Sequence, residues 1–133
     1  MRVTKKMLEE SKKRRHLVDF ELQILFDGFN DVFFHNRISK GIKAKFVSSK
    51  ILEKLSKAGP AHAAWRPAER EIWIDKTYNR SENMCSILLL HEMAHAALEG
   101  TYVGHPTKNP GHGMIYQAEI YRLFMAGGYD GLL

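Results

Sequence analysis

The sequence has one cysteine, Cys85, among its 133 residues. No disulfide can form within the chain and no paired-cysteine motif can build a zinc ribbon, so a reducing cytosolic compartment is expected. Long hydrophobic runs are also missing: the longest, Ile87 to Leu90, is far shorter than the roughly 20 residues that cross a bilayer. The amino terminus lacks the apolar stretch of a secretory signal. We therefore expect a cytoplasmic protein without a membrane span.

Internal repeats and low-complexity segments are absent too, and the length suits one hydrophobic core. We expect a single domain over residues 1–133, with a basic N-terminal helical segment at 1–18. Lys and Arg number 20 against 15 Asp and Glu, for a net charge of +5. The excess is concentrated in two clusters, Lys5, Lys6, Lys12, Lys13, Arg14 and Arg15, and Arg37, Lys40, Lys43, Lys45 and Lys50. Such clusters fit an acidic partner such as DNA, and equally a solvated surface.

Apolar spacing in the first half predicts helices followed by strands. A charged helix is expected over Thr4–Arg15 and an amphipathic one over Asp19–Phe34, with Asp19 as its N-cap. Alternation of apolar and basic residues predicts a strand at 42–48. Strands are also expected at 61–66 and 70–75, joined by a turn at 66–69; the β-branched and aromatic content of 70–75 makes it the stronger of the two. The first half is thus expected to supply a small sheet.

The second half is expected to be helical. A helix apolar nearly all round begins after Ser81, a good N-cap, and ends at Gly100. Glycines and prolines then predict a loop over 101–111. A last helix is expected over His112–Met125, stopped by Gly127-Gly128. The fold class is therefore α+β, with a small antiparallel-edged sheet packed on a central helix.

The central helix contains His91-Glu92-Met93-Ala94-His95, which matches the H-E-x-x-H motif. Residues i and i+4 lie on one helical face, so the imidazoles of His91 and His95 can point at one metal ion. Glu92 lies about 100° around the helix from His91, beside the ion but outside its ligand set. Three ionisable groups in apolar surroundings are costly to bury unpaired. The pattern predicts a Zn²⁺ site with Glu92 as general base acting on water.

A catalytic zinc site needs a third protein ligand and one open position. Thr101 stands where the metzincin pattern has its third histidine, which excludes that subclass. His105, His112 and Glu119 remain as candidates. A rigid helix start favours His112 over the mid-loop His105, whereas Glu119 could be a ligand or could hold a histidine in place.

Three segments together resemble the SprT-like domain, the protease domain of Spartan-type and bacterial SprT zinc metallopeptidases. They are Leu25-Phe26-Asp27-Gly28-Phe29-Asn30-Asp31-Val32-Phe33-Phe34, the His91–His95 motif, and His112-Gly113-Met114-Ile115-Tyr116. Their order and spacing cover roughly residues 19–125. The resemblance implies a minimal zincin fold and His112 as the third zinc ligand. It also implies protein substrates associated with or crosslinked to DNA.

Two functions follow as hypotheses. The first is a zinc endopeptidase with His91, His95 and His112 on the metal and Glu92 as base. The second is a nucleic-acid-binding module with a structural zinc site and no protease activity. A structural site is normally closed by four protein ligands, which favours the peptidase.

Several neighbouring residues have an expected role in either function. Residues 70–75, which include Trp73, are the candidate edge strand for binding substrate by β-augmentation. Tyr102, His105 and Tyr116 could stabilise an oxyanion, although a structural role fits each better. Cys85 is expected to be a small buried hydrophobe. No ligand spacing links His16, His35 and His62, which are expected at the surface or satisfied locally.

Overall fold

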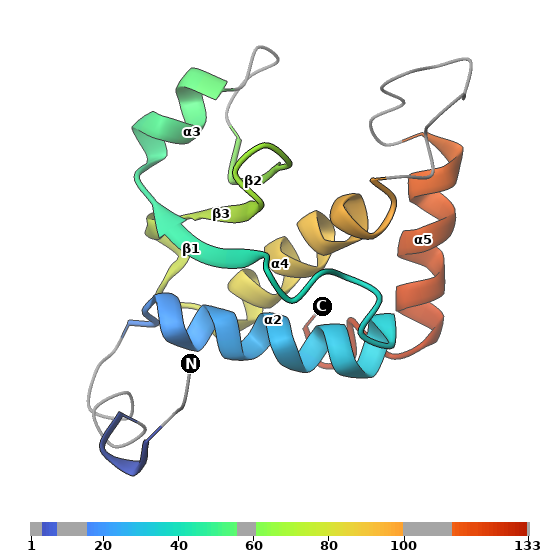
Figure 1. Ribbon diagram of the computed structural model, residues 1–133, viewed down its shortest axis with the longest axis horizontal. Helices are drawn as coiled ribbons and strands as arrows, with labels where there is room; N and C mark the ends of the chain where they lie inside the picture. The colour runs from blue at the N-terminus through green and yellow to red at the C-terminus, as the bar shows by residue number, and fades with distance from the viewer. Residues whose placement is uncertain (1–3, 8–15, 56–60, 100–112, 133) are drawn as a thin grey trace.

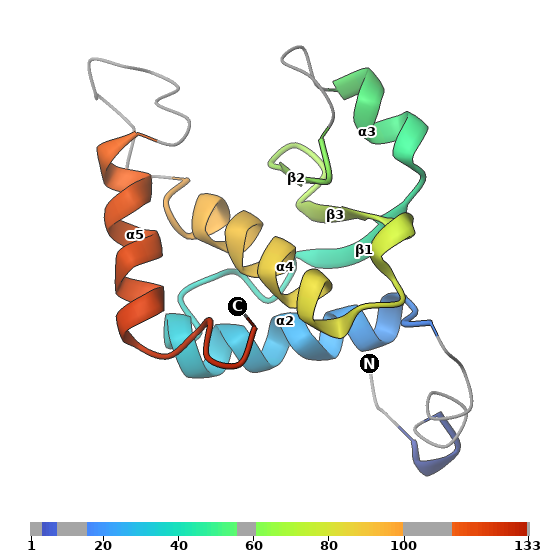
Figure 2. The ribbon, with the colours of Figure 1, turned by 180° about the vertical axis from the view of Figure 1, so that it is seen from behind.

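The computed structural model describes residues 4–7, 16–55, 61–99 and 113–132, and its fold is α+β. Figure 1 shows helix α4 crossing the middle of the molecule, between the sheet on one side and α5 on the other. Helix α2 runs beneath both the sheet and α4 (Figures 1 and 2). Of the predicted helix at 4–15, residues 5–7 are helical and the remainder lies outside the described residues.

Helix α2 spans Asp19–Phe34, as the apolar spacing predicted, and buries Leu22, Phe26, Asn30 and Phe34. Its N-cap is Val18, so the prediction of Asp19 as cap was wrong. The Glu21 carboxylate accepts the Val18 N–H at 3.0 Å and satisfies the first turn. The helix ends where His35 and Asn36 adopt left-handed φ angles of 52° and 58°, which breaks the helical hydrogen-bond pattern.

The three predicted strands form one mixed sheet in the order β1-β3-β2. Strand β1 (Lys43–Val47) pairs parallel to β3 (Glu71–Asp75), and β2 (Ala63–Arg66) pairs antiparallel to β3. The antiparallel edge was expected. The placement of 70–75 at an edge was wrong, because β3 is the central strand and both its sides are paired.

Helix α2 closes the free edge of β1 with polar side chains. The Asp19 carboxylate accepts the main-chain N–H of Phe46 at 2.9 Å. Gln23 accepts the N–H of Ala44 at 2.8 Å and donates to the carbonyl of Ile42 at 3.2 Å. An exposed strand edge invites a further strand unless its N–H and C=O groups are satisfied. Within the described sheet, the open edge is therefore that of β2.

Helix α4 (Glu82–Ala97) begins where predicted, with the Ser81 hydroxyl accepting the Met84 N–H at 3.1 Å. It contacts β2, β3, α2 and α5, which explains why it is apolar nearly all round. The core joins its side chains to those of α2 and the sheet, namely Leu22, Phe26, Ala44, Ile72, Ile74, Leu89, Leu90 and Met93. The expected stop at Gly100 lies outside the described residues.

Cys85 is fully buried in this core, as expected for a small hydrophobe. Its thiol donates to the Tyr78 carbonyl at 3.2 Å. Burial, together with the nearby Glu82 carboxylate, raises the pKa of the thiol to about 11.

Two short elements flank the sheet and were not predicted: helix α3 (Ser49–Leu55) and the 3₁₀ turn η1 (Lys76–Tyr78). The Asp75 carboxylate joins them, accepting the Ser49 hydroxyl at 2.8 Å and the Thr77 N–H at 2.9 Å. Burial raises the pKa of Asp75, but these hydrogen bonds outweigh it and hold the pKa below its ordinary value.

Helix α5 (Met114–Met125) packs against α4. The helix begins at Met114, two residues after the predicted start at His112. Gly127, with a φ of 89°, follows the end of the helix, as expected. No helix among the described ranges is long and apolar enough to cross a membrane.

Asn30 links α2 to the segment that connects it with β1. Its buried amide donates to the Ile38 carbonyl at 2.9 Å and accepts the Ile38 N–H at 3.2 Å. Both Ile38 groups would lose their partners if the amide were removed, and buried unsatisfied main-chain groups are costly.

We predict that Asn30→Ala lowers the free energy of unfolding by roughly 2–4 kcal/mol, since two buried main-chain groups lose their partner. Urea denaturation followed by circular dichroism measures this. Asn83→Ala, at an exposed position on α4, is the matched control and should change stability by less than about 0.5 kcal/mol. Equal losses in the two variants would contradict the role of Asn30.

Candidate active site

His91, Glu92 and His95 lie on consecutive turns of α4. The two imidazole rings are neighbours, with centroids 5.3 Å apart and planes at 67°. The His91 side chain is 39% exposed, whereas that of Glu92 is 9% exposed. The motif thus presents two imidazoles toward an accessible surface, with a buried carboxylate beside them.

Glu92 is one of the few buried charged residues among those the structure describes. Its Oε1 lies 4.0 Å from Nε2 of His91. Burial raises the pKa of the Glu92 carboxyl to about 7, while the main-chain N–H of Trp65 donates to the carboxylate and opposes that rise. A carboxyl group with a pKa near neutrality is suited to accept and return a proton.

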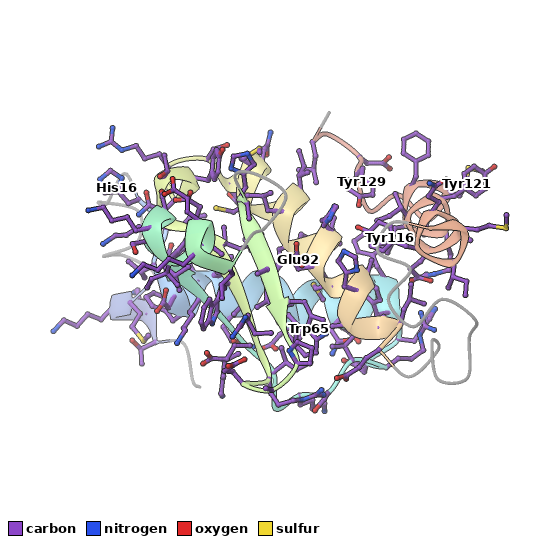
Figure 3. The ribbon with its side chains drawn as sticks, turned by 90° about the horizontal axis from the view of Figure 1, so that it is seen from above. His16, Trp65, Glu92, Tyr116, Tyr121 and Tyr129 are labelled. Atoms are coloured by element: carbon purple, nitrogen blue, oxygen red, sulfur yellow. The ribbon has the colours of Figure 1, made fainter. Side chains whose placement is uncertain are left out.

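The open edge of β2 supplies that N–H. The Asp75 N–H donates to the His62 carbonyl at 2.9 Å, and opposite pairs in an antiparallel ladder alternate between bonded and unbonded. With Trp65 opposite Ile72, the main-chain groups of Ala63 and Trp65 therefore point away from β3. In Figure 3 Trp65 and Glu92 are neighbours on facing elements.

Tyr116 of α5 closes the other side of the two imidazoles. Its ring stacks on His95 with centroids 4.3 Å apart and planes at 26°, and lies 5.3 Å from the His91 ring. Its hydroxyl donates to the His91 carbonyl at 3.1 Å. Tyr116 therefore has the structural role expected of it, because its ring and its hydroxyl both contact the motif.

The sequence profile of the SprT-like family matches residues 22–128. The chain belongs to the SprT-like family. No curated protein and no solved structure matches it. The resemblance seen in the sequence is confirmed over most of the chain, from α2 to the glycine stop after α5.

Candidates for a third ligand in this SprT-like site differ in their surroundings. Glu119 is paired with arginines: Arg122 Nε donates to its Oε1 at 3.0 Å, and Arg37 lies 3.7 Å from the same atom. His105 and His112 lie outside the described residues, as does Tyr102. Within the described ranges, no group of three His, Cys, Asp or Glu forms a ligand set.

The remaining histidines lie away from the SprT-like motif in ordinary settings. His16 is exposed, His35 forms the left-handed end of α2, and Nδ1 of His62 lies 3.0 Å from the Tyr78 hydroxyl. These positions agree with the expected surface or satisfied roles.

Trp73 and Trp65 lie on opposite faces of the sheet. Trp65 packs against the core and α4. Trp73 is flanked by Lys45 and Arg66, 5.5 Å and 5.0 Å from its ring centroid, and its indole N–H donates to Glu71 at 2.9 Å. The strand that faces the motif is therefore β2. Trp65 contributes its main-chain N–H to Glu92, and residue type alone does not reveal such a contribution.

We predict that Glu92 destabilises the metal-free protein at alkaline pH. Because its folded pKa is raised from 4.5 to about 7, the folded state binds more protons than the unfolded state across that interval. Stability should therefore fall as the pH rises from 4.5 to 7. Glu92→Gln should be more stable than wild type at pH 8 by up to about 3 kcal/mol, with no gain at pH 4.5.

Urea denaturation in the presence of a chelator measures this difference at the two pH values. Glu82→Gln, an exposed glutamate on the same helix, is the control and should show no gain at pH 8. Glu92→Gln that is less stable than wild type at pH 8 would contradict the buried charge.

Proposed function

We propose that this SprT-like protein is a zinc-dependent endopeptidase. The observation that carries the proposal is a buried carboxylate, Glu92, set between paired imidazoles and the open edge of a strand. The family match supports it, since the resemblance of the motifs is to zinc metallopeptidases. A minimal zincin fold, with intracellular proteins as substrates, is part of the same proposal.

The donor set fits zinc as far as it is described. Two imidazoles one helical turn apart, both partly exposed, are the ligands that an H-E-x-x-H site contributes. His112 is proposed as the third ligand, two residues before α5 begins. When bound, zinc supplies Lewis-acid activation of a water molecule and of the substrate carbonyl.

The substrate backbone would pair with β2. Ala63 directs its N–H and carbonyl, and Trp65 its carbonyl, outward from this edge, and edge strands bind extended peptides through such groups. A peptide in this position lies along the side of β2 that faces Glu92. Helix α2 occupies the β1 edge, so β2 is the open edge available in the described sheet.

Glu92 would carry the proton. Its carboxylate takes a proton from the attacking water and returns it to the departing amine. Trp65 N–H orients one carboxylate oxygen, and Tyr116 packs against both imidazoles, stacked on His95 and tilted against His91. A residue that moves protons but binds no metal is separable from the ligands by mutation.

We predict that Glu92→Gln retains zinc and fold but loses hydrolysis of an unfolded protein substrate by at least roughly 100-fold, since it removes the general base. His112→Ala should lose most of its zinc, and His105→Ala, its matched control in the preceding segment, should keep it. Zinc is measured by atomic emission and cleavage by gel electrophoresis. Cleavage by Glu92→Gln at the wild-type rate, or zinc loss only in His105→Ala, would overturn these assignments.

A second candidate function is DNA binding, alone or together with proteolysis. Besides the basic clusters in the sequence, one observation favours it: the sheet face turned away from α4 carries Lys45, Arg66 and the partly exposed ring of Trp73. Cations interleaved with an aromatic ring are typical of surfaces that bind single-stranded nucleic acid. A module that binds DNA around a structural zinc site would not need Glu92.

We predict that the protein binds single-stranded oligonucleotides with little sequence preference and with an affinity that falls steeply with salt, because phosphate contacts release counterions. Fluorescence anisotropy at 50 and 200 mM salt measures it, with Trp73→Leu as the variant and Trp65→Leu on the opposite face as control. Undetectable binding at the lower salt would leave proteolysis without DNA.

A further inference from the structure

Arg70 connects β1, the β2–β3 turn and the end of α4. It is the last residue of the turn at 67–70, and its φ of 55° is uncommon for a residue other than glycine. Its guanidinium pairs with the Glu99 carboxylate, just past the end of α4, at 2.6 Å. The same group lies 5.2 Å from the centroid of the Trp65 ring.

The main chain of Arg70 is fixed as well. Its N–H donates to the Pro67 carbonyl at 3.3 Å, and its carbonyl accepts the Lys43 N–H of β1 at 3.1 Å. The backbone is thus anchored to the sheet while the side chain reaches the end of α4. Residues held in a sparsely populated backbone region by such contacts are concentrated at functional sites.

We propose that Arg70 is a positioning residue that fixes the open-edge strand β2 against α4 and thereby keeps the Trp65 N–H on the Glu92 carboxylate. Its effect on catalysis rests on the proposed peptidase function. Its effect on the Trp65 N–H does not, and can be measured in the metal-free protein.

Trp65 is the link between Arg70 and Glu92. The indole lies beneath the Arg70 guanidinium and packs against the core, while the N–H of the same residue reaches Glu92. Strand β2 is paired only with β3 within the described sheet, so contacts to α4 must set its distance from that helix. The bridge from Arg70 to Glu99 spans this distance.

The energetics favour a role in position over one in stability. Both partners of the Arg70–Glu99 pair are about two-fifths exposed, and exposed ion pairs stabilise a fold only slightly. Losing the pair should leave the protein folded but allow β2 to separate locally from α4. Small displacements of a catalytic group reduce turnover far more than they reduce stability.

Arg66 offers a matched control on the same hairpin. It also pairs with a glutamate, Glu69 at 3.1 Å, and also lies over a tryptophan, Trp73 at 5.0 Å. Its side chain, however, is on the sheet face turned away from α4. Removing it takes away the same kinds of contact without touching the bridge to α4.

The test is amide hydrogen exchange of Trp65, measured by NMR on the metal-free protein. Arg70→Ala should exchange this N–H at least ~10-fold faster than wild type, as expected for local opening of one strand edge, with an unchanged circular dichroism spectrum. Arg66→Ala should stay within about 2-fold. Glu99→Gln, which breaks the pair from its exposed end, should accelerate exchange in the same direction and serves if Arg70→Ala does not fold.

Turnover by the zinc-loaded protein gives the catalytic readout. Arg70→Ala should lower kcat about 10-fold without loss of zinc, because the Glu92 carboxylate loses the Trp65 N–H that orients it, and Arg70→Lys, which keeps the charge beside Glu99 and Trp65, should restore most of it. Unchanged exchange at Trp65 in Arg70→Ala, or equal acceleration in Arg66→Ala, overturns the positioning role. A wild-type protein without hydrolysis refutes the peptidase proposal instead, and the exchange result still decides the role of Arg70.

Discussion

The main-chain hydrogen-bonding requirement of a three-stranded sheet determines how this molecule is arranged. Such a sheet has two edges whose N–H and C=O groups need partners. Side chains of α2 supply them along β1, where Asp19 and Gln23 bond to Phe46, Ala44 and Ile42. The β2 edge is left facing α4, and one of its N–H groups meets the carboxylate of the His-Glu motif. The helix that closes one edge therefore also determines which edge can be used for binding.

The proposed function of the motif opposes the stability of the fold. A carboxylate buried to this extent in an apolar core would be replaced by a hydrophobic side chain if stability alone were favoured. Within the part of the chain that the structure describes, the Trp65 N–H only partly offsets this burial, so the pKa of Glu92 is about 7. More hydrogen bonds would stabilise the charged form and weaken the carboxylate as a base. The limited hydrogen bonding of Glu92 thus suits the proposed role, in which the carboxylate both takes and returns a proton.

Local patterns in the sequence predicted most of the elements: α2 carries a clear hydrophobic period, α4 is a long apolar stretch behind a good N-cap, and the strand segments favour extended structure. The exceptions have physical reasons. Helix α3 has seven residues, and although Ile51, Leu52 and Leu55 have helical spacing, two turns are too short for a period to decide. Asp19 resembles an N-cap by residue type, but Phe46, distant in sequence, takes its carboxylate. Strand order is likewise a non-local property, which is why 70–75 was expected at an edge and lies at the centre.

The candidate site divides in the same way. The helical spacing of His91, Glu92 and His95 follows from sequence alone, and the structure adds that the two imidazoles are adjacent. The pairing of Glu119 was only half visible in the sequence: Arg122 lies three residues on in the same helix, whereas Arg37 comes from the segment after α2. Trp65 was invisible as a contributor since any residue type has the same main-chain N–H. His112 as metal ligand stays a prediction.

The burial of Cys85 makes the surface of this protein free of accessible thiols. A covered sulfur whose pKa is raised to about 11 is almost entirely protonated at neutral pH, and thiolate is the form that alkylating reagents attack. A cysteine introduced at exposed Ala68, on the tip of the hairpin, would therefore be the one site that a maleimide modifies. A spin label or fluorophore could report the motion of the β2–β3 tip without any background substitution in the core.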